Sequence, residues 1–178
     1  MRIFQYAYTT PDARATALAW TGTLGIGPWS VRGPFTAPGA SYRGEPYRAS
    51  LTVARTFDGD IMIELIQQHD EHPSIFRDAI ERGGYGFHHV AVVAADFDGR
   101  AAQLASSGGP AVFEDVLPTG AHVAFFAGAS GFPGLVELVE LTPAQAAGYR
   151  ELQALCTDWD GRDPWRAGPT TTETSREA

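Results

Sequence analysis

The fold is decided by two similar stretches, QYAYTTPD at residues 5–12 and HVAVVAAD at residues 89–96. Each begins with a polar residue, continues as a strand-like run and ends on an Asp, and 84 positions separate the two copies. The same spacing relates Gly25 to Gly109, and a helical pattern of apolar residues lies between each Asp and its Gly. Because Asp favours the N-cap of a helix and Gly its C-terminal end, both patterns have the boundaries expected of helices. The chain therefore carries an internal repeat that begins with a strand and a helix.

The end of the repeat matches as well, in IMIELI at residues 61–66 and GLVELV at residues 134–139. Here Glu64 and Glu137 are 73 positions apart, which is 11 fewer than 84, so the first copy holds 11 more residues than the second. These extra residues fall in 27–46, a stretch rich in Gly, Pro and aromatic residues. We expect them to form an enlarged loop over the open side of the molecule, where loops carry specificity.

The repeat predicts an α+β fold in which two βαβββ modules in tandem form a cupped, mixed β-sheet around a metal site. Strands are expected at residues 2–9, 28–33, 48–57, 60–68, 86–94, 111–117, 121–128 and 134–141, and helices at 12–24, 73–82, 97–107 and 142–157. The expected divisions are a first module at 1–72, a linker helix at 73–85, a second module at 86–141, a C-terminal helix and extension at 142–166, and a disordered tail at 167–178. The tail is expected because the composition after Pro164 turns to Gly, Thr, Ser and Glu.

The composition excludes several classes of partner and mechanism. The formal net charge is −8 and the pI is about 5.0, so neither nucleic acid nor an anionic membrane is an expected partner. All 13 basic residues are Arg, which excludes a catalytic lysine, and the single cysteine, Cys156, allows no intrachain disulfide. The N-terminus lacks the apolar run of a signal peptide and no segment is long enough to span a membrane, so we expect a soluble, cytoplasmic protein.

Four polar residues occupy matching places in the two copies of the repeat. Gln5 and His89 stand on the first strand of each copy, and Glu64 and Glu137 stand on the last, flanked by apolar residues. A carboxylate in a half-buried strand needs a partner, so two carboxylates that meet across a pseudo-two-fold axis require a cation between them. Gln5 and His89 complete the shell with neutral donor groups. We therefore predict a metal site made of these four residues.

Two adjacent histidines raise the question of which one is the metal ligand. His89, and not His88, matches Gln5 in the repeat. Because adjacent residues of a strand face opposite sides, His88 is expected to pack under a helix or to bond to the backbone. A further polar cluster at residues 69–72 lies in a connection, where we predict an exposed turn.

These residues carry a resemblance to the vicinal oxygen chelate superfamily, which includes glyoxalase I, methylmalonyl-CoA epimerase, extradiol dioxygenases and bleomycin-resistance proteins. The resemblance rests on the paired modules, on GFHHVA at residues 86–91, and on the strand ends IEL at 63–65 and VEL at 136–138. It implies that each first and each last strand supplies one metal ligand, which maps onto the same four residues. The stretch 84–91 and the linker helix are most similar to the epimerases, whereas a Gln, Glu, His, Glu set is similar to some glyoxalase I enzymes.

The ligand types define the chemistry that we expect. Three oxygen ligands and one imidazole suit one divalent ion of zinc, nickel, cobalt, manganese or magnesium. A non-haem iron oxygenase normally uses two histidines, so a ring-cleaving dioxygenase is the least favoured interpretation. We expect a metal-dependent isomerase or epimerase in which Glu64 and Glu137 move a proton beside a metal-bound carbonyl of a small-molecule, acyl-CoA-like substrate. The alternative is a non-catalytic protein that sequesters small molecules, and a homodimer is left open in either case.

Residues of the enlarged loop and its borders are the candidates for substrate binding. Trp29, Tyr42 and Tyr47 are expected to cover an apolar substrate, with packing in the core as the alternative. Arg43 and Arg48 are expected to hold a carboxylate or a CoA phosphate, with an ordinary exposed surface position as the alternative.

Overall fold

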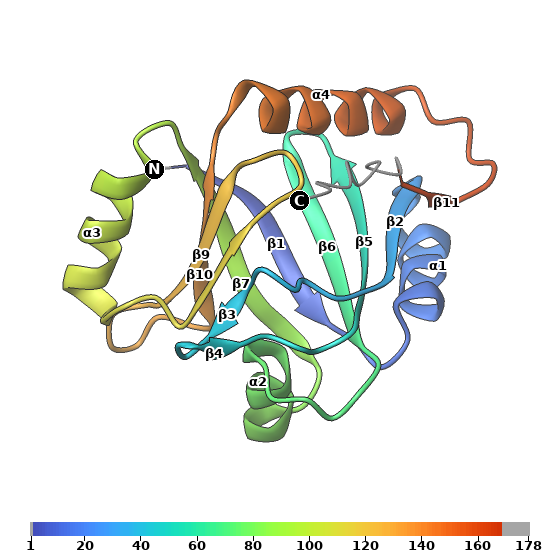
Figure 1. Cartoon of the computed structure of the whole chain (residues 1–178). Helices are drawn as coiled ribbons and strands as arrows, with labels where there is room; N and C mark the ends of the chain where they lie inside the picture. The colour runs from blue at the N-terminus through green and yellow to red at the C-terminus, as the bar shows by residue number, and fades with distance from the viewer. Residues whose placement is uncertain (1, 169–178) are drawn as a thin grey trace, which may run out of the picture.

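A computed structural model describes residues 2–168 and shows the expected α+β fold (Figure 1). In chain order the elements are β1 (Ile3–Thr9), α1 (Ala13–Leu24), β2 (Trp29–Phe35), β3 (Ser41–Tyr42), β4 (Glu45–Pro46), β5 (Leu51–Asp58), β6 (Ile61–Gln68), α2 (Ile75–Gly83), β7 (Gly86–Ala94), α3 (Phe97–Gly108), β8 (Phe113–Val116), β9 (His122–Ala127), β10 (Leu135–Glu140), α4 (Pro143–Thr157) and β11 (Trp165–Ala167). All the predicted helices and strands are present, most within two residues of the expected bounds, and β3, β4 and β11 are additional. Of the predicted disordered tail, residues 169–178 lie outside the described residues, and Ala167 belongs to β11.

The strands of residues 2–168 form one sheet in the order β11-β2-β5-β6-β1-β7-β10-β9-β8-β3-β4. In the first module β1 runs parallel to β6, and in the second module β7 runs parallel to β10. The modules join edge to edge where β1 pairs antiparallel with β7. The sheet curls into a cup, and α1 and α3 lie on its outside (Figure 1). The first strand of each module therefore lies at the centre, beside the last strand of the same module.

Side-chain caps begin the helices of both modules. Asp12 and Asp96 each accept a hydrogen bond from the backbone N–H three residues later, at 2.9 and 3.0 Å. Each cap satisfies one otherwise unpaired amide of the first turn, which contributes about 1 kcal/mol to stability. The linker helix α2 begins two residues later than predicted, because its N-cap is Ser74, whose hydroxyl accepts from the Arg77 amide at 2.8 Å.

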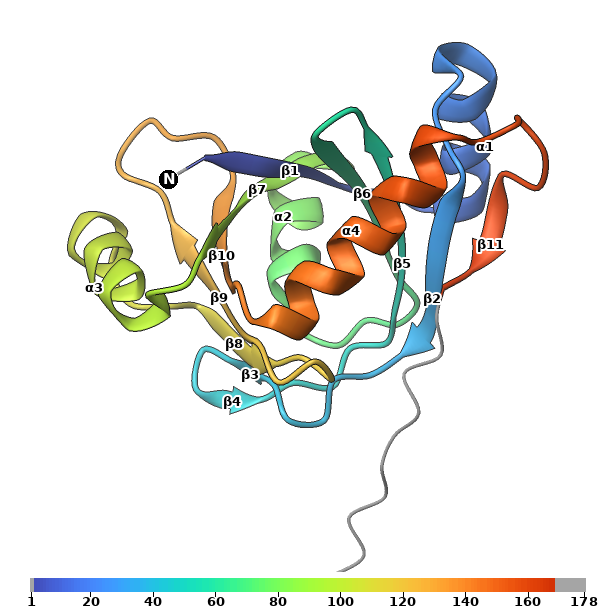
Figure 2. The same cartoon turned by 90° about the horizontal axis from the view of Figure 1, so that it is seen from above.

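The extra residues of the first module connect the two edges of the cup. From β2 the chain crosses to the other edge of the sheet, where β3 pairs antiparallel with β8 (Figure 2). Four residues between positions 40 and 49 are buried in an apolar cluster that also contains residues of α2 and β9. They are Ala40, Tyr42, Tyr47 and Ala49. The segment lies between the two edges of the curled sheet (Figure 2), and it is part of the core next to α2.

The C-terminal helix α4 crosses the other end of the cup (Figure 2), opposite α2 (Figure 1). Gln153 donates to the Gly59 carbonyl at 2.9 Å, and the Cys156 Sγ accepts from the Phe57 amide at 3.3 Å. These bonds fasten α4 to the hairpin of β5 and β6. The cup is therefore walled by the sheet and the 36–46 segment, with a helix across each end. In residues 2–168, no helix is both long enough and apolar enough to cross a membrane.

Candidate metal centre

The carboxylates of the two modules point into the cup. Leu65 packs in an apolar cluster on the outer face beside α1, and Leu138 packs in a second outer cluster beside α3. Because successive residues of a strand face opposite sides, the neighbouring Glu64 and Glu137 face inward. The alternation of the strands thus delivers both carboxylates to the same interior.

Gln5, Glu64, His89 and Glu137, here called the quartet, meet inside the cup. The Gln5 Nε2 donates to Glu64 Oε2 at 3.0 Å and to Glu137 Oε2 at 3.4 Å, and lies 3.2 Å from His89 Nε2. The His89 Nε2 is 3.2 Å from Glu137 Oε2 and 3.7 Å from Glu64 Oε2. None of the four is more than 9% exposed. The fold therefore brings together four side chains from four strands, as the repeat predicts.

The quartet holds more negative charge than its protein partners offset. Within residues 2–168, the pair between Arg55 Nε and Glu64 Oε1, at 2.6 Å, is the only ion pair between the quartet and an arginine. Among the described residues, the polar partners of the Glu137 carboxylate are the amide of Gln5 and the ring of His89. A buried carboxylate is costly unless a cation or several hydrogen bonds compensate it. This imbalance is what a divalent cation would correct.

The types of donor group in the quartet suit a divalent ion. With metal–ligand bonds of about 2.0–2.2 Å, neighbouring ligand atoms are roughly 3.0–3.4 Å apart. The distance of 3.2 Å from His89 Nε2 to Glu137 Oε2 lies in this range, and the distance of 3.7 Å to Glu64 Oε2 is longer. Among residues 2–168, no group of three or more His, Cys, Asp or Glu side chains has the arrangement of a complete metal site. In the quartet, the Gln5 amide nitrogen lies between the acceptors. Turning that amide over would present its oxygen, the atom able to act as a ligand.

His88 lies behind His89, under α2, as the sequence predicts. The two Nδ1 atoms are 2.8 Å apart, and His88 Nε2 is 3.2 Å from the Ile75 carbonyl oxygen. The His88 ring packs on Phe76 with centroids 4.8 Å apart. Burial and, to a smaller extent, the neighbouring His89 lower the pKa of His88 to about 3. His88 therefore contacts a quartet member without joining the quartet.

Two residues that the sequence analysis did not single out border the quartet. Arg55 pairs with Glu64 across β5 and β6, and its side chain is 41% exposed, so it leads from the buried site toward solvent. Tyr149 of α4 packs on Phe4, with ring centroids 5.1 Å apart. Burial raises the pKa of Tyr149, and the charge of Glu137 raises it further.

Replacing Arg55 by methionine is expected to destabilise the metal-free protein by about 1–3 kcal/mol. The change leaves Glu64 buried without its cation, and the half-exposed position of Arg55 keeps the loss below that of a fully buried pair. Urea unfolding in EDTA measures the loss, and a divalent metal added afterwards should restore stability to the variant. The matched control is Arg2→Met, which removes an exposed pair with Asp60 and should change stability by less than about 1 kcal/mol. Equal stability of the Arg55 variant and the wild type would contradict the charge argument.

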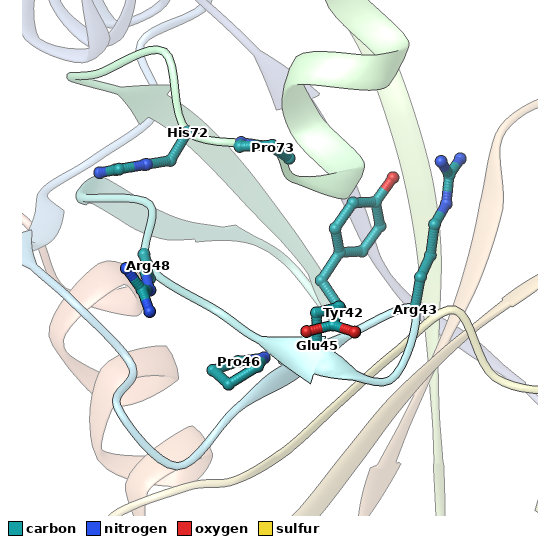
Figure 3. A pocket seen from close by; sticks show the side chains of 7 residues that line it. All are labelled: Tyr42, Arg43, Glu45, Pro46, Arg48, His72 and Pro73. Atoms are coloured by element: carbon teal, nitrogen blue, oxygen red, sulfur yellow. The ribbon is translucent and has the colours of Figure 1, made fainter.

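Three of the predicted substrate-binding residues lie together, away from the quartet. Tyr42, Arg43 and Arg48 line a surface pocket of about 290 Å³ (Figure 3). The other lining residues are Glu45, Pro46, His72 and Pro73. The Tyr42 hydroxyl donates to Asp78 Oδ2 at 2.6 Å, and Arg43 Nη2 donates to the same oxygen at 2.5 Å. Burial raises the pKa of Tyr42 to about 12, with a further contribution from the bond to Asp78. This pocket shares no lining residue with the quartet.

The other two predicted substrate-binding residues have the packing position that the sequence left as the alternative. Trp29 is fully buried beside α1, in the same outer cluster as Leu65, and its Nε1 donates to Thr21 Oγ1 at 3.1 Å. Because this face is opposite to that of Glu64, Trp29 is removed from the candidates for substrate binding. Tyr47 packs edge-on against a core phenylalanine inside the cup, and its buried hydroxyl has no hydrogen-bond partner in residues 2–168.

A sequence model described as the Glyoxalase/Bleomycin resistance protein/Dioxygenase superfamily matches residues 4–127, more than half of the chain. The chain belongs to this superfamily. The superfamily match includes Gln5, Glu64 and His89 and ends before Glu137 and Tyr149. The internal repeat and the geometry connect β10 with the site.

Solved structures show the same fold at low identity. One is a hypothetical protein of Bacillus halodurans C-125, at 18% identity and a TM-score of 0.55, covering 79% of this chain and 94% of that one. Another is methylmalonyl-CoA epimerase of Mycobacterium tuberculosis, at 16% identity and a TM-score of 0.51, covering 82% and 91%. A third, also a methylmalonyl-CoA epimerase, has 18% identity and a TM-score of 0.50, covering 79% and 94%. A comparison with curated proteins found no match.

Proposed function

We propose that this member of the superfamily is a metal-dependent isomerase or epimerase that removes a proton beside a substrate carbonyl group. In this proposal the quartet holds one divalent ion, and Glu64 and Glu137 are the carboxylates available to move the proton. The observation that carries the proposal is the meeting of two buried carboxylates, an imidazole and an amide with one arginine to offset them. A bound divalent ion supplies Lewis acidity toward a substrate carbonyl.

The surroundings of the two carboxylates favour Glu137 as the base. Glu64 is held by Arg55 at 2.6 Å and by Gln5 at 3.0 Å. Within residues 2–168, Glu137 has no arginine partner, and its two contacts are longer, at 3.2 and 3.4 Å. Hydrogen bonds to the charged form of a carboxylate weaken its affinity for a proton. We therefore assign proton abstraction to Glu137 and a fixed, charge-compensated position to Glu64.

The enclosure of the quartet supports a reaction that develops charge. The four residues of the quartet are buried. Helix α4 crosses one end of the cup (Figure 2), and an apolar cluster lies next to α2 at the other. Fixed polar groups in such a water-poor interior stabilise developing charge more strongly than water does, since they are already oriented. We assign the approach of the substrate to the side of Arg55, the partly exposed neighbour of the quartet.

An acyl-CoA is the first substrate class to test. The solved structures with this fold include proteins named methylmalonyl-CoA epimerase, although at 16–18% identity that likeness concerns the fold alone. Arg48 is exposed in the 290 Å³ pocket and makes no ion pair within residues 2–168. A guanidinium in that position suits a carboxylate or a phosphate of a long substrate.

A second candidate function is the binding of a small molecule without turnover. The observation that favours it is the separation of the 290 Å³ pocket from the quartet, since a ligand held in that pocket would not need to touch the carboxylates. The two functions differ in their dependence on metal, which the following experiment measures.

Protein purified without chelator is expected to carry about one divalent ion per chain, and His89→Ala should lower metal affinity by at least about tenfold. The change removes one of four donors from the quartet. Elemental analysis gives the occupancy, and competition with a chelator gives the affinity. The control is His122→Ala, which removes an exposed histidine paired with Glu140 at 2.7 Å. Full occupancy and unchanged affinity after His89→Ala would overturn the metal proposal.

A further inference from the structure

The two adjacent histidines form a hydrogen-bonded chain that runs from the backbone of α2 to the quartet. It begins at the carbonyl oxygen of Ile75, which lies 3.2 Å from His88 Nε2. It continues through the two Nδ1 atoms, 2.8 Å apart, and ends at His89 Nε2 inside the quartet. Both rings are buried, with 2% and 0% exposed. The ring positions are fixed further by Phe125, which lies 4.9 Å from the His89 ring and 6.4 Å from the His88 ring, measured between centroids.

The chemistry of each link in this chain sets the position of every proton. A carbonyl oxygen only accepts, so His88 Nε2 must carry the hydrogen. A buried His88 with no carboxylate in contact is neutral, because a buried charge without a partner is costly. Its Nδ1 is then an acceptor, so the hydrogen between the two rings belongs to His89 Nδ1. Because His89 Nδ1 carries this hydrogen, Nε2 is the ring nitrogen left to bind a metal, and it is the nitrogen that faces Glu64 and Glu137.

We propose that His88 is a positioning residue that holds His89 in the tautomer able to bind a metal through Nε2. The inference rests on the proposed metal site for its functional meaning, but the tautomer is a property of the chain alone. Partners of this kind orient a ligating imidazole and raise its basicity, and their loss typically costs 10–100-fold in metal affinity. The usual partner is a carboxylate, a backbone carbonyl or water. In this chain the partner is a second imidazole, His88, which is itself hydrogen-bonded to the Ile75 carbonyl of α2.

Nitrogen-15 NMR of the histidine side chains in the metal-free protein tests the inference directly. In the wild type, His89 Nδ1 should carry the hydrogen that lies between the two rings. His88→Phe keeps a ring of similar shape under α2 but removes both the donor and the acceptor. The variant should therefore show His89 in a mixture of tautomers, with Co²⁺ affinity lowered by about 10–100-fold. His88→Asn retains an acceptor near the Nδ1 position and should partly restore both the single His89 tautomer and the Co²⁺ affinity.

The controls separate this inference from the proposed function and from a folding defect. His122→Phe replaces an exposed histidine on β9 and should alter neither the His89 tautomer nor Co²⁺ affinity. Near-ultraviolet circular dichroism checks that the His88 variants remain folded. A His89 tautomer that is unchanged in His88→Phe would overturn the role of His88, whatever the metal content. A wild type with the expected tautomer that binds no Co²⁺, Zn²⁺, Ni²⁺, Mn²⁺ or Mg²⁺ would overturn the proposed function and leave the positioning role of His88 supported.

Discussion

Glu137→Gln will slow the exchange of a substrate α-proton in D₂O by about 10²–10⁴-fold, the usual contribution of a general base. Glutamine keeps the shape and an oxygen donor but has no basic carboxylate, so the proton has no acceptor on that side of the cup. Mass spectrometry of an acyl-CoA or an α-hydroxycarbonyl compound incubated with the metal-loaded protein measures the incorporated deuterium. Binding of the same compound, measured by calorimetry, should change far less than the exchange rate.

The matched control for this variant is Glu140→Gln on the same strand. Glu140 lies three residues further along β10 and bonds to His122 at 2.7 Å, so its loss leaves the quartet intact. Metal content measured on both variants separates loss of the base from loss of the ion. Equal exchange by wild type and Glu137→Gln would remove Glu137 as the base. Consumption of a substrate only in the presence of O₂ would favour the dioxygenase, and tight binding without turnover would favour sequestration.

Trp29→Ala will lower the free energy of unfolding by about 3–5 kcal/mol, as expected for a fully buried aromatic side chain. Trp29 has no exposed surface, packs edge-on against Trp20 with centroids 6.3 Å apart, and donates a hydrogen bond to Thr21. The change creates a cavity between α1 and the sheet and leaves the rest of the cup in place. Urea unfolding followed by circular dichroism measures the loss.

Leu24→Ala is the control for that cavity. Leu24 lies at the C-terminal end of α1, the helix that packs on Trp29, and 62% of its surface is exposed. Its truncation should therefore change stability by no more than about 0.5 kcal/mol. Metal content and ligand affinity of the folded Trp29 variant should equal those of the wild type. Weaker ligand binding with unchanged stability would return Trp29 to the substrate-binding residues.

The positions of the helices and most strands follow from local sequence. Asp12 and Asp96 begin their helices because an N-cap bond needs only residues three positions apart. In the strand endings at 61–66 and 134–139, Glu64 and Glu137 face the opposite side from Leu65 and Leu138, because only alternate residues of a strand share a face. The start of α2 was misplaced since Ser74 is a stronger cap than the residue before Pro73, and both lie within one short connection.

The four members of the quartet were predictable because two local patterns, the first strand and the last strand of a module, occur in both copies of the repeat. Each pattern fixes the face of its own strand, and the repeat relates the two modules, so four residues can be placed without knowing the sheet order. Arg55 could have been found in the same way. The turn at Asp58-Gly59 pairs Asp58 with Ile61, and that register places Arg55 opposite Glu64.

Other features depend on contacts between segments that no local pattern relates. Trp29 was expected near the substrate because it belongs to the enlarged loop and its borders. A residue at the start of a strand can face either side, and only the packing of α1 on the sheet places Trp29 outside. Tyr149 comes near Glu137 because α4 folds back across the cup, a path that depends on bonds to the β5 and β6 hairpin. By itself, the sequence determined which side chains the first and last strands of each module turn inward. The tertiary structure decided which of them have a second partner, because the link from Ile75 through His88 to His89 exists only once α2 packs against β7.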